Sequence, residues 1–209
     1  MAGKGPANTG SMVVGDRRVD EAPYHSALGS RAEQLADACD RYEHPDGSVA
    51  VQFDIFSGPL PDAFDACDVL YLEPPWRDGF ALYERRTGHT GRDWLALMER
   101  AGELIVSSGL PAVVTISTWT PMPKPDRMEL GRQHSLPCAY WCYGDVGELP
   151  AQDVDVVAAL ADRFGCVGDF FAGYGRSARI FAAHGKRWVL SDYNPHCIGY
   201  IAQEAPTWP

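Results

Sequence analysis

The sequence lacks the features that would place the chain in a membrane or in a disulfide-stapled scaffold. No apolar run approaches the ~20 residues that a membrane-spanning helix needs. The first twelve residues are rich in glycine and alanine and contain no apolar stretch of the kind found in signal peptides. The six cysteines form no CxxC pair, so neither a structural zinc site nor a thioredoxin-type motif is indicated. We therefore expect a reduced, soluble protein of the cytoplasm, with no membrane contact and no metal site.

Positive charge is also scarce. Lysine and arginine total 18 against 28 aspartates and glutamates, and the net charge of −10 opposes non-specific binding to a polyanion. The imbalance is uneven, because residues 77–135 hold eight basic and seven acidic side chains. If the chain binds nucleic acid, we expect the contact there, with the loops 77–91 and 119–135 as candidate substrate-recognition segments.

The length of 209 residues and the ordinary share of hydrophobic residues, 45%, indicate one folded domain. Residues 1–23 show no periodicity and are expected to form a flexible arm, which leaves 24–209 as the single domain. Apolar spacing predicts helices and strands that alternate along the chain. The expected helices are 31–42, 93–108, 154–164, 176–184 and 195–203, and the expected strands are 48–53, 68–72, 112–117, 139–143, 167–171 and 188–191. Such alternation predicts an α/β fold, a mixed but mostly parallel sheet with helices on both faces.

One candidate functional segment follows the strand expected at 167–171. The chain runs through Gly173-Tyr174-Gly175 into a helix, and glycines at such a turn let the backbone approach a ligand closely. Asp192 ends the next strand, 17 residues after Gly175, where a carboxylate can accept hydrogen bonds from ribose hydroxyls. The turn is not GxGxxG and no Lys-Ser/Thr pair follows it, so dinucleotides and ATP are disfavoured. A nucleoside cofactor without a pyrophosphate fits better, and a purely structural turn with a helix cap at Asp192 or Asn194 is the alternative.

The second stretch is Glu73-Pro74-Pro75-Trp76, directly after the buried strand at 68–72. Two consecutive prolines fix φ and restrict the residue before each of them, so the turn can hold backbone carbonyls in set positions. Trp76 offers a face on which a flat ring can stack, an interaction worth ~1–3 kcal/mol per base. The alternative is a strand terminator followed by a core tryptophan.

Together the two stretches resemble the amino-methyltransferases that use S-adenosylmethionine (SAM) to methylate N6 of adenine or N4 of cytosine. Those enzymes carry an Asp/Asn-Pro-Pro-Tyr/Phe/Trp catalytic motif and a D-x-F-x-G-x-G cofactor motif, which here reads from Asp169 to Gly175. The catalytic motif comes first in the chain, the permuted order of the β-class DNA enzymes and of the MT-A70-like adenine methyltransferases. The resemblance covers 49–118 and 150–204 and implies a Rossmann-like class I methyltransferase fold.

The resemblance also implies a role for each matching residue. Phe171, Gly173 and Gly175 would surround the methionine part of SAM, with Asp169 near its amino group; Asp192 would bind the ribose hydroxyls, and Asp54 would face the adenine edge. Glu73 and the carbonyl of Pro74 would accept hydrogen bonds from the target amino group, with Pro75 keeping the turn rigid and Trp76 stacked on the base. Two acceptors suit this chemistry, because they pull a delocalised amine nitrogen towards sp³ geometry and aim its lone pair.

The chain departs from the family at position 73, where it has Glu in place of Asp or Asn. The extra methylene moves the oxygen about a bond length, and misplacement by ~1 Å can cost on the order of 10²-fold in rate. The silent partner subunit of the heterodimeric mRNA enzyme also has Glu-Pro-Pro, but it lacks the aromatic residue that Trp76 supplies here. Three alternatives stay open: an active enzyme, a catalytically silent subunit that binds nucleic acid or a partner methyltransferase, and an enzyme adapted to an altered substrate.

The expected substrate is DNA, with N6 of adenine favoured over N4 of cytosine and with RNA as an alternative. Only the two short loops are available for recognition, which favours a short site, single-stranded substrate or help from a second subunit in a homo- or heterodimer. Arg85, Arg86, Lys124, Arg127 and Arg132 are candidates for phosphate contacts.

Overall fold

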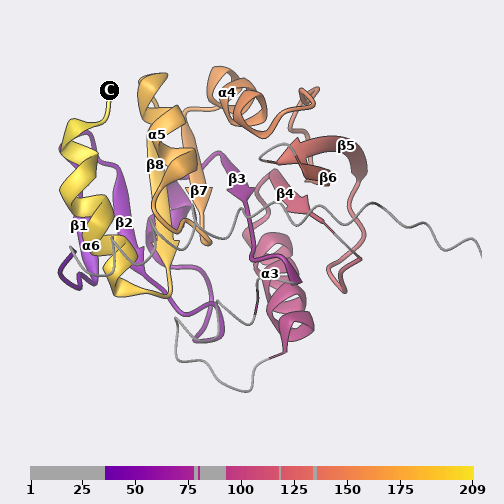
Figure 1. Cartoon of the computed structure of the whole chain (residues 1–209), viewed down its shortest axis with the longest axis horizontal. Helices are drawn as coiled ribbons and strands as arrows, with labels where there is room; N and C mark the ends of the chain where they lie inside the picture. The colour runs from indigo at the N-terminus through magenta and orange to yellow at the C-terminus, as the bar shows by residue number, and fades with distance from the viewer. Residues whose placement is uncertain (1–35, 78–79, 81–92, 118, 134–135) are drawn as a thin grey trace, which may run out of the picture.

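The computed structural model describes residues 36–77, 80, 93–117, 119–133 and 136–209. The expected flexible arm, 1–23, and nearly all of the expected 77–91 loop lie outside these residues. Within them, eight strands form one sheet in the order β1-β2-β8-β7-β3-β4-β6-β5, which Figure 1 shows from one edge to the other. The strands are β1 (Arg41–Glu43), β2 (Val49–Gln52), β3 (Val69–Leu72), β4 (Ala112–Ile116), β5 (Arg127–Gln133), β6 (Leu136–Tyr143), β7 (Cys166–Asp169) and β8 (Arg187–Asp192).

The fold is of the predicted α/β class, but the sheet is mixed rather than mostly parallel. The five central strands, β2, β8, β7, β3 and β4, run parallel to one another, whereas β1, β6 and β5 each pair antiparallel with their neighbours. The connections explain the difference, because β1–β2 and β5–β6 are joined by short links that permit only antiparallel pairing. The parallel strands are joined by longer crossovers, mostly helical.

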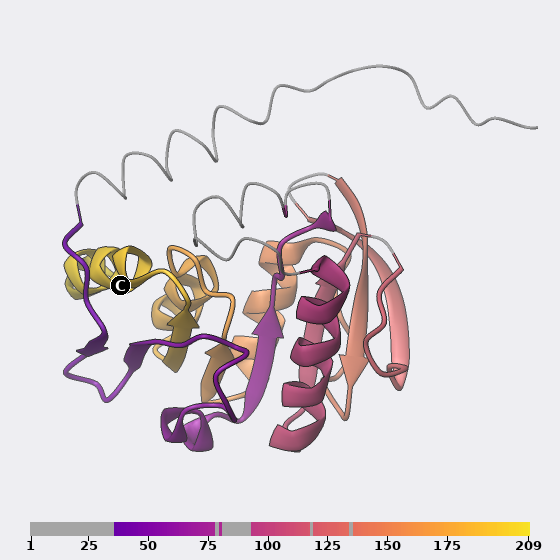
Figure 2. The same ribbon diagram turned by 90° about the horizontal axis from the view of Figure 1, so that it is seen from below.

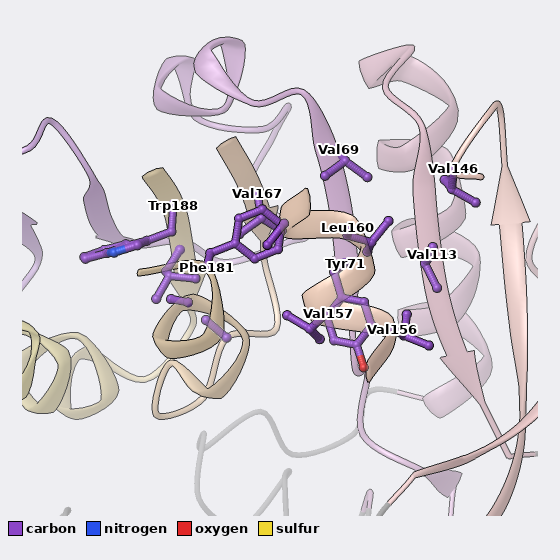
Figure 3. Packing of buried hydrophobic residues seen from close by; sticks show 14 of the residues in the cluster. Val69, Tyr71, Val113, Val146, Val156, Val157, Leu160, Val167, Phe181 and Trp188 are labelled. Atoms are coloured by element: carbon purple, nitrogen blue, oxygen red, sulfur yellow. The ribbon is translucent and has the colours of Figure 1, made fainter. Parts of the chain in front are cut away.

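Helices cover both faces of the sheet, as predicted. On one face lies α3 (Trp94–Ser108), whose apolar stripe packs with Leu70 and Val114 (Figure 2). The other face is covered by α4 (Asp153–Arg163), α5 (Arg176–Ala183) and α6 (Pro195–Glu204). Alternate residues of one strand therefore enter opposite cores. Figure 3 shows Val69 and Tyr71 of β3 in the core of the α4–α5 face, beside Leu160 and Phe181.

Two expected elements are wrong. The described part of the expected helix 31–42 is not helical, and its last residues form β1, whose backbone pairs with β2. The segment 119–135 is not a loop throughout, because β5 occupies 127–133 and forms a hairpin with β6. In both places pairing with a neighbouring strand overrides the local signals. No helix in the described part of the chain is both long and apolar enough to cross a membrane.

Candidate functional site

The residues singled out from the sequence meet at one edge of the sheet. Asp192 ends β8 beside Gln52 of β2, and Asp169 ends β7 beside Leu190. Because β2, β8, β7 and β3 are parallel, their carboxyl ends share this edge, and the segments that follow them carry Asp54, Asp192, the glycine turn and Glu73.

This edge is also a topological switch point. From β3 the chain passes through α3 to β4 on one face, whereas from the adjacent β7 it passes through α5 to β8 on the opposite face. The two connections therefore leave the strand ends towards opposite faces of the sheet. In open α/β sheets ligands bind outside the carboxyl ends of the strands at such a switch point.

The glycine turn after β7 is held together by Asp169. One carboxylate oxygen accepts the backbone N–H of Phe171 at 2.9 Å, and the other accepts the hydroxyl of Ser177, in the first turn of α5, at 2.8 Å. The Asp169 side chain is buried, and burial raises its pKa to about 7, although these two hydrogen bonds lower the pKa. Asp169 therefore contacts its own turn, and its described hydrogen bonds build the loop expected to receive the cofactor.

Asp192 ties the same turn to the end of β8. Its Oδ2 accepts the backbone N–H of Gly173 at 2.9 Å, and its Oδ1 accepts the N–H of Asn194 at 2.9 Å. Burial raises the pKa of Asp192, while these backbone hydrogen bonds lower it. Asn194 caps α6 by accepting the N–H of His196, so the expected cap and the expected acidic strand end are both present. Asp54, after β2, accepts the N–H of Phe56 at 3.0 Å.

The two glycines of the turn differ in what surrounds them. Gly173 and Gly175 both have positive φ, 50° and 75°. A methyl group added at Gly173 would meet nothing within 4 Å, whereas one added at Gly175 would lie 2.7 Å from the ring of Trp208. Gly173 therefore borders open space, while Gly175 is closely packed by Ile201 of α6 and by Trp208.

The proline turn after β3 is braced by two indole groups. The indole N–H of Trp94, at the start of α3, donates to the carbonyl oxygen of Pro75 at 2.8 Å. The indole N–H of Trp76 donates to Oε1 of the buried Gln133 at 3.0 Å. A hollow of about 10 Å³ borders Pro74, Pro75 and Trp76, room for about one water molecule. A base does not fit into this hollow as it stands.

The glycine turn and the proline turn are joined by an ion pair that the sequence did not reveal. Nη1 of Arg176, the first residue of α5, lies 3.1 Å from Oε1 of Glu73, and Nη2 lies 2.8 Å from Oδ2 of Asp153. Burial lowers the pKa of Arg176, but the two carboxylates outweigh it and raise the pKa. Tyr71 donates its hydroxyl to the same Oε1 of Glu73 at 2.7 Å. The position of Arg176 directly after the glycine turn is the one signal that could have suggested this contact.

The basic residues expected in the loop 119–135 do not lie together, because Arg127 and Arg132 lie near opposite ends of β5. Since β5 and β4 are both antiparallel to β6, β5 runs in the direction of β4, from Arg127 at the amino-end edge to Gln133 at the site's edge. Arg127 pairs with Glu129 at 2.8 Å and contacts the carbonyl of Gly147. Arg132 lies next to Gln133 near the site, and Arg85 and Arg86 lie outside the described residues.

A larger cavity, of about 230 Å³, lies elsewhere. It is lined by His44, Lys186, Trp188 and Trp208 among others, near the amino end of β8. None of the residues expected to bind cofactor or substrate borders it. This cavity lies at the amino end of β8, away from the candidate site at the carboxyl ends of the strands, and we assign it no role in that site.

Comparison of the chain with protein-family models gives no match, and comparisons with characterised proteins and with solved structures give none either. The functional argument therefore depends on the geometry of the site.

Proposed function

We propose that the chain is a SAM-dependent methyltransferase that acts on an exocyclic amino group of a base in DNA, with N6 of adenine favoured over N4 of cytosine. One observation carries the proposal. The glycine turn and the Glu73-Pro74-Pro75-Trp76 turn follow adjacent parallel strands at the switch point, and the ion pair of Arg176 with Glu73 joins them across 103 positions of sequence.

The residues around the glycine turn suit a nucleoside cofactor. Gly173 borders open space, and Asp192 and Asp54 hold carboxylates at the neighbouring strand ends, where the hydroxyl and amine groups of a nucleoside need acceptors. A bound SAM would supply an electrophilic methyl group on its sulfonium. The Rossmann-like class I fold of such enzymes is part of the proposal, and the doubly wound order of the five central strands supports it.

The proline turn suits the target amino group. Glu73 and the carbonyl of Pro74 offer two acceptors on a backbone that the prolines and Trp94 keep rigid. Acceptors at fixed positions orient the amine and stabilise the positive charge that develops on its nitrogen, so no strong base is needed. Trp76 would stack on the base, which has to leave a duplex or come from a single strand, since flipping costs a few kcal/mol.

The proposal is tested in two steps. Calorimetric titration of the folded chain with SAM and with S-adenosylhomocysteine should show saturable 1:1 binding. Transfer of a labelled methyl group to single-stranded DNA, duplex DNA and RNA, followed by nucleoside analysis, should then yield N6-methyladenine in DNA. No binding by a folded, monodisperse sample would contradict the cofactor assignment, and a labelled product other than an amino-methylated base would contradict the substrate assignment.

A second function, a catalytically silent subunit that binds nucleic acid or a partner methyltransferase, is favoured by the edge strand β5. Met128 and Leu130 on this outermost strand are 60% and 82% exposed. An exposed edge strand with apolar side chains is suited to contact with another chain. This function predicts that the isolated chain binds nucleic acid or forms a dimer in light scattering but transfers no methyl group to any substrate.

A further inference from the structure

Two hydrogen-bond donors, Tyr71 and Arg176, hold the carboxylate of Glu73, whose side chain is one methylene longer than the aspartate of the family. Tyr71 lies two residues earlier on β3, so both side chains point to the same face of the sheet. The Tyr71 hydroxyl donates to Oε1 of Glu73 at 2.7 Å, and the Tyr71 ring is fully buried in the core that Figure 3 shows. The Glu73 side chain therefore reaches back towards β3, which takes up the methylene by which it exceeds aspartate.

Arg176 contacts the same oxygen of Glu73. Its guanidinium bridges Oε1 of Glu73 and Oδ2 of Asp153, whose side chain is 5% exposed. Asp153 is fixed in turn, because it begins α4 and its other oxygen accepts the N–H of Val154 at 2.9 Å. A planar guanidinium held between two carboxylates has little freedom to rotate, which a lysine ammonium would keep.

We infer that Arg176 is a positioning residue for Glu73, an inference that rests on the proposed function. Tyr71 and Arg176 both contact Oε1, so they fix the position of this oxygen and leave Oε2 to accept from the target amino group. The glutamate in this chain then performs the task of the family's aspartate because Arg176 and Asp153 hold it in place. Glu73 and Arg176 therefore form one functional unit.

The test compares Arg176→Gln with Arg179→Gln in the methyl-transfer assay. Arg179 is a matched control, because it lies on the same helix and pairs with a carboxylate, that of Glu204 at 3.3 Å, while its guanidinium stacks on Trp208 and forms no ion pair with Glu73 or Asp153 in the described part of the chain. Arg176→Gln should lower kcat by about 10²-fold, the cost of ~1 Å misplacement. The KM for DNA and the calorimetric dissociation constant for SAM should stay within about threefold, and Arg179→Gln should leave kcat unchanged. Circular dichroism and urea unfolding show whether both variants fold.

A second variant separates positioning from general damage. Aspartate at position 73 is too short to keep both contacts on Oε1, so Glu73→Asp should also lower kcat. In the Glu73→Asp background, Arg176→Gln should then cause little further loss, because the unit is already broken. Additive losses would contradict the inference.

Other outcomes overturn it as clearly. If the wild-type chain is active and Arg176→Gln leaves kcat unchanged or raises it, Arg176 does not position Glu73, while the proposed function stands. If the folded wild-type chain transfers a methyl group to no nucleic acid, the proposed function fails and the inference fails with it.

Discussion

Asp192 accepts the backbone N–H of Gly173 at 2.9 Å, so the carboxyl end of β8 holds the glycine turn that follows β7. The two residues are 19 positions apart, and the parallel pairing of β7 with β8 brings them to the same edge of the sheet. The other oxygen of the same carboxylate accepts a hydrogen bond from the backbone N–H of Asn194. One side chain thus fixes the shape of the turn from the end of the neighbouring strand.

Asp192→Asn should weaken both the turn and the binding of SAM. The amide nitrogen of asparagine cannot accept, so one of the two backbone N–H groups loses its partner, at a cost of about 1–3 kcal/mol in unfolding free energy. The SAM dissociation constant should rise at least tenfold by calorimetry. Asn194→Ala is the control, since removing the α6 cap costs about 1 kcal/mol without removing the carboxylate of Asp192. If Asp192→Asn and Asn194→Ala weaken SAM binding equally, local unfolding and not the loss of the carboxylate explains the effect.

Asp169 should make the chain less stable as the pH rises towards neutral. Its pKa in the folded chain is about 7 against an ordinary value of 3.8, so between these values the folded state binds more protons than the unfolded state. Stability from this group is therefore greatest at and below about pH 4, falls by up to ~1.4 kcal/mol per pH unit as the pH rises to about 7, and stays low above that.

Asp169→Asn imitates the protonated carboxyl, because its oxygen can accept from Phe171 and its amide can donate to the hydroxyl of Ser177. Urea unfolding at pH 5 and pH 8 should show a smaller loss of stability with pH in the variant than in the wild-type chain. The two proteins should differ most at pH 8, where the variant should be the more stable. Parallel pH profiles would show that burial does not perturb this carboxyl.

The sequence was sufficient for the central strands and for the edge at which the candidate residues gather. The apolar runs 68–72 and 112–117 predicted two of these strands, β3 and β4, and residues that end parallel strands must share one edge. The sequence did not predict the ion pairs of Arg176 with Glu73 and Asp153, because these contacts depend on how α4 and α5 pack on the sheet. The hairpin strand β5 was missed although Met128 and Leu130 alternate with polar residues, because neighbouring prolines and charges indicated a loop.

Trp76 should be needed for methyl transfer and unimportant for SAM. Its indole N–H is held by Gln133, which fixes the ring beside the proline turn. Trp76→Ala should abolish transfer and weaken DNA binding roughly five- to 150-fold, the equivalent of ~1–3 kcal/mol of stacking. Trp76→Phe keeps a ring face and should retain part of both. The SAM dissociation constant, measured by calorimetry, should change less than threefold in either variant; its loss together with transfer would rule out a stacking role.

The two glycines of the turn provide the sharpest separation of ligand binding from packing. Alanine at Gly173 or Gly175 incurs the same left-handed backbone penalty, about 1–2 kcal/mol. The added methyl at Gly175 would also lie 2.7 Å from the Trp208 ring, whereas at Gly173 it would enter open space. Gly175→Ala should therefore lower the unfolding free energy more than Gly173→Ala does.

The effects on cofactor affinity should have the opposite order: Gly173→Ala should weaken SAM binding more than Gly175→Ala does. Among samples that urea unfolding shows to be folded, Gly173→Ala should raise the SAM dissociation constant at least tenfold, because the methyl occupies space that the ligand needs. Trp208→Ala removes the obstacle at position 175, so Gly175→Ala should lower the unfolding free energy less in the Trp208→Ala background than in the wild-type chain. If Gly173→Ala binds SAM as tightly as the wild-type chain, the open space beside Gly173 is not the cofactor site.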